Sequence, residues 1–169
     1  MIRKTRRLLL GPITDNDREN VIAILTNQEV KKTYMIPDFE TEEQVEKLFC
    51  RLRDLSISED FYQIGIFYES ELIGFANEVE RKNGAIELGY AIHPKYHNRG
   101  YATEMLMAMI EQLWKDGFSE IITGAFEENS ASIRVMEKCG MKKLDKTDQI
   151  EYKGVNHTCV YYSKKKNHE

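Results

Sequence analysis

Apolar and polar residues alternate with two different periods along the chain, and the period changes after Ile92. Between residues 61 and 92, aromatic and β-branched residues follow the two-residue period of β-strands. Two polar segments, Glu69–Glu71 and Arg81–Gly84, interrupt this pattern and have the composition of hairpin turns. The pattern predicts three consecutive strands that pair as antiparallel neighbours: Phe61–Tyr68, Leu72–Glu80 and Ala85–Ile92.

Beyond Pro94 the apolar residues recur with the 3.6-residue period of a helix, and Gly117 stands where a glycine commonly ends one. The apolar stripe consists of Ala102, Met105, Leu106, Met109, Ile110, Leu113 and Trp114. The pattern predicts another strand at Glu120–Phe126. Because a strand–helix–strand connection is nearly always right-handed and joins parallel strands, we expect this strand to run parallel to Ala85–Ile92.

Capping and turn residues indicate the remaining elements. Asp15 or Asp17 can cap a helix, and Thr41–Gln44 has the form of a capping box that begins a second helix. The other predicted elements are the strand Arg7–Leu10, the helix Ser130–Lys138 closed by Gly140, and the strands Lys143–Tyr152 and His157–Ser163. The fold class that follows is α/β, with a mixed, mostly antiparallel sheet flanked by helices. No linker divides the sequence, so we expect one domain over residues 1–169.

Composition and charge exclude several classes of protein. The chain has 24 basic and 28 acidic residues, a mixed balance that does not indicate a nucleic-acid partner. Its three cysteines are odd in number and lack C-x-x-C spacing, so we expect them to be reduced. The basic N-terminus is followed by too few apolar residues for a signal peptide or a membrane span. We expect a cytoplasmic protein that binds no membrane.

One histidine pair has metal-ligand spacing but the wrong context. His93 and His97 are four residues apart, yet Pro94 blocks a helix between them and the glutamate of an H-E-x-x-H motif is missing. We therefore expect no metal.

The segment His97–Glu104 joins the end of a predicted central strand to the start of the long helix. A helix start leaves several N–H groups unpaired and carries the positive end of the helix dipole, so it suits phosphate oxygens. Gly100 would let such a ligand come close, and Arg99 adds a cation. An ordinary strand-to-helix turn would use the same residues.

Two segments resemble one family. The sequence from His93 to Leu106 resembles the coenzyme A pyrophosphate loop of the GNAT superfamily of N-acetyltransferases, whose pattern is Q/R-x-x-G-x-G/A. His97 replaces the usual Gln or Arg at the first position. The sequence from Glu128 to Met141 resembles the N-x-x-S helix start of the same superfamily, with Asn129 and Ser132 in register. The resemblance extends over nearly the whole chain and is strongest to the Rim-type branch of ribosomal-protein N-terminal acetyltransferases.

The resemblance implies a GNAT-like sheet whose two parallel middle strands splay apart to admit pantetheine. It also implies acetyl-CoA as the cosubstrate and an amine as the acceptor. The cofactor-binding residues that follow are Tyr90, Ala91, Ile92, His97, Asn98, Arg99, Gly100, Tyr101, Ala102, Thr103, Asn129 and Ser132. Small side chains on one face of the strand, at Gly89 and Ala91, favour close approach of a ligand, although a helix packed there would also need the room.

Two residues are candidates for catalysis. Glu87 is the one carboxylate in an otherwise apolar strand, so partial burial would raise its pKa and suit it to act as a base, whereas a salt bridge at a strand end is the structural alternative. Ser132, by resemblance, faces the coenzyme sulfur and would stabilise the leaving thiolate, unless it serves only the helix start. Spare candidates for that role are Tyr101, Tyr152, Tyr161 and Tyr162.

The sequence leaves the acceptor open. An acidic cluster before and within the second predicted helix favours a cationic acceptor or is simply a solvated helix; it consists of Asp38, Glu40, Glu42, Glu43 and Glu46. A protein N-terminus and small-molecule amines both fit, as do a monomer and a homodimer. The alternative to an enzyme is a non-catalytic module that binds acetyl-CoA and acylates nothing.

Overall fold

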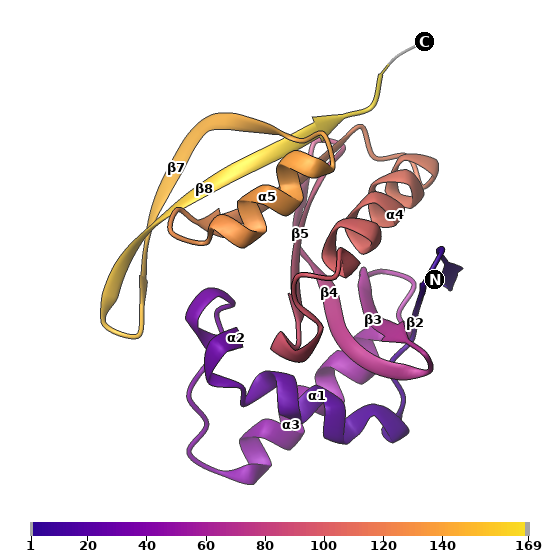
Figure 1. Cartoon of the computed structure of the whole chain (residues 1–169), viewed down its shortest axis with the longest axis vertical. Helices are drawn as coiled ribbons and strands as arrows, with labels where there is room; N and C mark the ends of the chain where they lie inside the picture. Colours follow the sequence, from indigo (N-terminus) through magenta and orange to yellow (C-terminus); the bar gives the residue numbers. More distant parts are fainter. Residues whose placement is uncertain (1, 168–169) are drawn as a thin grey trace. The chain divides into compact units, whose positions relative to one another are not determined.

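The computed structural model describes residues 2–167. The chain forms two compact units: unit 1 comprises the residues up to Asn77 together with Tyr90–Tyr101, and unit 2 comprises Glu78–Gly89 and the residues from Ala102 onward. Figure 1 shows the elements in chain order. Two strands, β4 (Glu71–Lys82) and β5 (Ala85–Ile92), contribute residues to both units.

The strands form an eight-stranded mixed sheet in the order β1-β2-β3-β4-β5-β6-β8-β7. β4 and β5 are joined through Asn83 and Gly84, which both have positive φ, as a tight hairpin requires. β5 and β6 (Glu120–Phe126) are parallel, as the sequence predicted, and α4 (Tyr101–Lys115) connects them. Their paired residues run from Ala85 opposite Glu120 to Leu88 opposite Thr123, and both strands continue beyond that last pair.

In unit 1 the strands are antiparallel and the helices cover an apolar core. The strands β1 (Arg3–Lys4), β2 (Leu8–Gly11) and β3 (Gln63–Tyr68) pair in sequence, and β3 pairs with β4. The helical elements are η1 (Asp15–Asp17), α1 (Arg18–Leu25), α2 (Gln28–Thr33) and α3 (Glu42–Ser56). The core between them contains Ile13, Val21, Ile24, Leu25, Val30, Ile36, Phe49, Leu72, Phe75 and Ala91.

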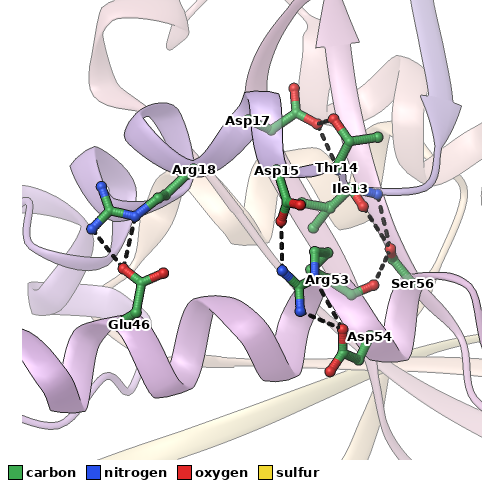
Figure 2. A network of polar contacts seen from close by, with 9 residues as sticks. All are labelled: Ile13, Thr14, Asp15, Asp17, Arg18, Glu46, Arg53, Asp54 and Ser56. Atoms are coloured by element: carbon green, nitrogen blue, oxygen red, sulfur yellow. Dashed lines mark hydrogen bonds and ion pairs between the residues drawn. The ribbon is translucent and has the colours of Figure 1, made fainter.

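Polar contacts fasten the segment before α1 to the end of α3, as Figure 2 shows. The Ser56 hydroxyl accepts a hydrogen bond from the Ile13 amide (2.8 Å) and donates one to the Arg53 carbonyl (2.6 Å). The Arg53 guanidinium pairs with Asp15 at 2.5 Å. Three residues after Asp15, Arg18 pairs with Glu46 of α3 at 2.6 Å. The buried Ser56 bonds are the stronger constraint, because exposed ion pairs contribute about 0–1 kcal/mol each.

In unit 2 two helices contact one face of the C-terminal strands. α5 (Ser130–Lys138) ends beside β8 (Val155–Lys165), where the Lys164 ammonium donates to the Cys139 carbonyl at 2.7 Å. The same ammonium lies 5.6 Å from the Trp114 ring of α4. Cys139 is buried, and its thiol donates to the Thr103 carbonyl at 3.6 Å, which connects the end of α5 to the first turn of α4.

The edge strand of unit 2 is β7 (Lys142–Tyr152), which pairs antiparallel with β8. Residues alternate between the two faces of a strand, so the even-numbered β8 residues Tyr162 and Lys164 share the face that the helices contact. The odd-numbered residues Cys159 and Tyr161 therefore point to the other face.

Some local predictions were confirmed only in part. Asp17 is the N-cap residue of α1, as expected, but its side chain makes no capping bond there. It accepts instead from the Thr14 amide (2.7 Å) and hydroxyl (2.8 Å), at the start of η1. The Thr41 capping box is half formed: the Thr41 hydroxyl accepts from the Gln44 amide, but the Gln44 side chain accepts from the amide of Glu40. Neither α2 nor β1 was predicted, because each is short, at six and two residues.

Candidate active site

The loop that precedes α4 lies in unit 1 and is held to the end of β5. After Ile92 the chain forms the short helix η2 (Pro94–Tyr96), and the His93 side chain accepts from the Lys95 amide at 3.2 Å. The His97 Nε2 atom lies 2.6 Å from the Ile92 carbonyl oxygen, which requires a proton on that nitrogen. His97, where the family pattern has Gln or Arg, thus joins the loop to the strand that precedes it.

Backbone conformation gives this loop the character of an anion site. Asn98 has φ 59° and Gly100 has φ 79°, so two left-handed residues flank Arg99. Glycine adopts this conformation without the steric cost that other residues incur. Directly after Gly100 comes α4, a helix of 15 residues, whose first amides have no intrahelical partner. Unpaired amides and the helix dipole together favour a bound phosphate.

The two histidines of the loop use ring nitrogens for backbone contacts. Burial, together with the neighbouring His97 and Lys95 charges, lowers the pKa of His93. Among residues 2–167 there is no group of three or more His, Cys, Asp or Glu side chains placed to hold a metal ion.

Tyr101 packs inside unit 1. Its side chain is buried, and its ring lies 5.0 Å from the ring of Tyr68. Hydrogen bonds with Glu69 and with Tyr101 raise the pKa of Tyr68 to about 12. Because its hydroxyl interacts with Tyr68, Tyr101 has a packing role that explains its place in the loop without any contact to the coenzyme.

The end of β5 contacts β4 closely. A Cβ atom on Gly74 would lie 2.4 Å from the Ala91 carbonyl oxygen, so a side chain at Gly74 cannot be accommodated without movement. Ala91 is buried in the core of unit 1 with residues of α1 and α3. The helix packing considered in the sequence analysis therefore accounts for the small side chain of Ala91. The expected contacts of Tyr90, Ala91 and Ile92 with the coenzyme would use their backbone.

Glu87 lies in unit 2 and is half-buried. Burial is the main cause that raises the pKa of its carboxyl group; Lys146 opposes this shift, while Glu80 and Asp148 add to it. The direction suits a general base, whose pKa should lie near the working pH. Lys146 and Asp148, on the β7 strand, were not singled out in the sequence, because nothing in the pattern of that strand indicates that their charges act on Glu87.

Tyr161 belongs to the same neighbourhood. The Lys146 ammonium lies 4.3 Å from its ring centroid and 3.7 Å from the Asp148 carboxylate. Burial first, and then hydrogen bonds with Asp148 and Cys159, raise the pKa of Tyr161 well above its usual range. A phenol with a raised pKa keeps its proton at neutral pH, so Tyr161 has a proton to donate there.

The start of α5 carries the second predicted pair. The Asn129 side chain accepts from the Ser132 amide at 3.2 Å, which makes Asn129 the N-cap. Ser132 is half-buried in the first turn of the helix. Asn129 therefore caps the helix in whose first turn Ser132 lies.

Neighbouring side chains support this turn. Glu128, which precedes Asn129, pairs with His157. The His157 ring stacks on the Phe126 ring, with 4.2 Å between the ring centroids. Tyr152 packs at the edge of this group, 6.0 Å from Phe126, and the Tyr162 hydroxyl lies 3.5 Å from the Glu137 carboxylate. Both tyrosines thus have structural partners.

The acidic cluster is partly neutralised. Asp38 pairs with the buried Lys31 at 3.3 Å, and Glu46 pairs with Arg18. Glu42 and Glu43 occupy the first turn of α3, where negative charge is favoured by the helix dipole. Each of these four carboxylates has a structural explanation, so the cluster is weak support for a cationic acceptor.

Comparison with known proteins bears on the whole chain. The model of the acetyltransferase (GNAT) domain family matches residues 7–142. The chain is 30% identical to an uncharacterized N-acetyltransferase, YoaA, of Bacillus subtilis (strain 168), over 89% of this chain and 88% of that protein. The chain belongs to the GNAT acetyltransferase family. It is therefore an acetyl-CoA-dependent N-acetyltransferase, an acyltransferase, as the two motifs predicted.

Solved structures agree on the fold. A GNAT-family acetyltransferase from Bacillus anthracis matches with a TM-score of 0.84 and 26% identity, over 98% of each chain. A RimL ribosomal L7/L12 alpha-N-protein acetyltransferase in complex with coenzyme A matches with a TM-score of 0.85 over 98% of each chain, at 18% identity. The second likeness shows the fold alone. Within the described part of this GNAT protein, no helix has the length and apolar character needed to cross a membrane.

Proposed function

We propose that this GNAT protein transfers an acetyl group from acetyl-CoA to a primary amine by direct attack in a ternary complex. The observation that carries the proposal is the loop before α4, with left-handed residues at Asn98 and Gly100 and a 15-residue helix directly behind it. Such a loop presents amides to a pyrophosphate. Membership of the GNAT family indicates acetyl-CoA as the cosubstrate, and acetyl-CoA contains a pyrophosphate.

The coenzyme-binding residues are proposed in three groups. Backbone amides and carbonyls of Tyr90, Ala91 and Ile92 bind pantetheine, much as an added strand would. The segment from His97 to Thr103 binds the pyrophosphate, with Arg99 as an added cation. Asn129 shapes the helix start beside which the thioester sulfur lies. A protein with the same fold, at 18% identity, was solved in complex with coenzyme A, which supports the choice of ligand.

The chemistry requires two proton-handling groups. The amine nitrogen attacks the thioester carbonyl carbon, and Glu87 accepts the proton that the amine loses, directly or through one water. The carbon–sulfur bond then breaks, and the departing thiolate is stabilised by the Ser132 hydroxyl at the positive end of α5 before it is protonated. The raised pKa of Glu87 supports the first role. The second is supported by the place of Ser132 in the first turn of α5, where the helix dipole favours negative charge.

The remaining part of the proposal concerns the acceptor amine, the oligomeric state and the cellular location. Both units act as one acetyltransferase domain in the cytoplasm, as a monomer or homodimer, without nucleic acid or membrane. The acceptor is a protein N-terminus, as the Rim-type resemblance suggests, or a small-molecule amine. The RimL name belongs to a protein of 18% identity and supports the first choice only through the fold.

Thiol release tests the proposal. Purified protein, acetyl-CoA and a panel of N-terminal peptides, polyamines, aminoglycosides and amino acids should give amine-dependent thiol release for at least one acceptor. Initial rates at varied concentrations of both substrates should then give intersecting double-reciprocal lines. Parallel lines would indicate a covalent acetyl-enzyme and refute direct attack. Tight coenzyme binding without release for any amine would favour the non-catalytic binding module.

A further inference from the structure

Arg7, near the N-terminus, contacts the loop that precedes α4 from outside the family motif. It lies just before β2, 92 residues from Arg99, yet its guanidinium donates to the Arg99 carbonyl oxygen at 2.9 Å. The same group stacks over the Tyr101 ring at 4.6 Å from its centroid. It also lies 3.3 Å from the point that a Cβ atom on Gly100 would occupy. All three contacts fall within unit 1, on three consecutive residues of the loop.

The hydrogen bond fixes the direction of one peptide group. The peptide bonds that the structure describes are trans, so the N–H of Gly100 points opposite to the Arg99 carbonyl. While that carbonyl is bound to Arg7, the Gly100 N–H is directed to the other side of the loop. A flipped Arg99–Gly100 peptide would instead present a carbonyl oxygen to a phosphate, which would repel it.

The Arg99–Gly100 peptide is the peptide of this loop that can flip most easily. Glycine tolerates both signs of φ, so rotation about the Arg99–Gly100 peptide costs less than at any neighbouring residue of the loop. Arg7 opposes the flip in two ways, because the planar guanidinium bonds the carbonyl while its face rests on Tyr101. Tyr101 is itself fixed by Tyr68, whose ring also lies 6.4 Å from that of Tyr96.

We propose that Arg7 is a positioning residue for the coenzyme: it holds the Arg99–Gly100 peptide in the orientation that directs an amide toward the pyrophosphate. The inference rests on the proposed function. It differs from direct recognition of a phosphate, because Arg7 acts through the loop and its effect should require the pyrophosphate but not the 3′-phosphate.

Calorimetry with four proteins and three ligands tests this role. The proteins are wild type, Arg7→Ala, Arg7→Lys and the matched control Arg6→Ala, which removes the same charge from an adjacent exposed residue. The ligands are coenzyme A, 3′-dephospho-coenzyme A and pantetheine. Arg7→Ala should raise the Kd of coenzyme A and of dephospho-coenzyme A about tenfold, the size of effect expected for one hydrogen bond from a charged donor. Arg6→Ala should change neither by more than about twofold.

Arg7→Lys should recover part of the affinity, since it keeps the charge but loses the planar group that bonds and stacks at once. Pantetheine should bind all four proteins alike. In steady-state kinetics, Arg7→Ala should raise the KM for acetyl-CoA while kcat at saturation stays near the wild-type value.

Each other result overturns the inference. Wild-type affinity in Arg7→Ala would show that the contact is not used. If Arg7→Ala raised the Kd of coenzyme A but not that of dephospho-coenzyme A, Arg7 would contact the 3′-phosphate directly. If Arg7→Ala also raised the Kd of pantetheine, or lowered kcat together with the melting temperature, Arg7 would have a general structural role. Lack of coenzyme binding by wild type would refute the proposed function together with the inference.

Discussion

A methyl group at Gly74 should disturb both stability and coenzyme binding. In Gly74→Ala the new Cβ would lie 2.4 Å from the Ala91 carbonyl oxygen and 3.1 Å from the Ile92 Cα atom. Both are backbone atoms and cannot rotate away. Because a carbon–oxygen contact normally measures about 3.3 Å or more, the end of β5 must move by about 1 Å.

The cost follows from two opposing effects. Overpacking a well-packed site costs about 1–3 kcal/mol. Replacing glycine by alanine in a strand recovers about 0.4–1 kcal/mol through the unfolded state. The net loss is therefore at most about 2.6 kcal/mol, which corresponds to a fall of up to about 10 °C in melting temperature for a protein of this size. The displaced backbone includes Ala91 and Ile92, so the Kd of coenzyme A should rise as well.

Thermal unfolding followed by circular dichroism, together with calorimetry, measures both effects. Gly11→Ala is the matched control, because a Cβ there meets only the Ile2 side chain, at 3.9 Å, and its φ lies outside the left-handed region. That variant should be as stable as wild type or slightly more stable. A Gly74→Ala protein with wild-type melting temperature and affinity would refute the reasoning from this contact.

Three further substitutions address the catalytic proposals. Glu87→Gln should lower turnover about 10²–10⁴-fold with coenzyme affinity unchanged. The raised pKa of Glu87 means that its carboxyl group holds its proton more tightly in the native state than in the unfolded state. Wild type should therefore lose stability as pH rises from the unfolded pKa to the folded pKa. Urea titrations at several pH values should show this loss in wild type and not in Glu87→Gln. Ser132→Ala should lower kcat at least tenfold, toward the 10²–10³-fold typical of a lost donor, without changing the melting temperature. Asn129→Ala should cost about 1 kcal/mol of stability, since it removes the cap; normal stability in this variant would show that the cap contributes little.

Periodicity predicted those elements that are long or bounded by clear turns. The strands β3, β4 and β5, the helix α4 and the parallel pair β5–β6 were all indicated by the sequence, because each depends on a repeated apolar pattern or on a chirality rule. The six-residue α2 was missed although Asn27 caps it, because so short a helix carries hardly one apolar period.

Site residues were predictable where a local motif exists. Gly100 was expected in its loop from neighbouring residues, and the family resemblance placed Asn129 at a helix start. Contacts between distant segments were not predictable: nothing near Arg7 in the sequence indicates Arg99 as its partner, and the side chain of His97 gave no sign that it would bond the Ile92 carbonyl. The partners of the acidic cluster were not predictable for the same reason, because Lys31 and Arg18, which pair with Asp38 and Glu46, stand in other helices.

The buried thiol of Cys139 can report how often the two helices of unit 2 separate. Burial raises its pKa to about 11, so about one molecule in a thousand would carry the reactive thiolate at pH 8 even if a reagent could reach it. Its bond to the Thr103 carbonyl must also break first. Alkylation of Cys139 in the native protein therefore counts openings between α4 and α5, and its rate at increasing urea would give the free energy of that local opening. Coenzyme that binds at the first turn of α4 should slow this labelling in proportion to its occupancy.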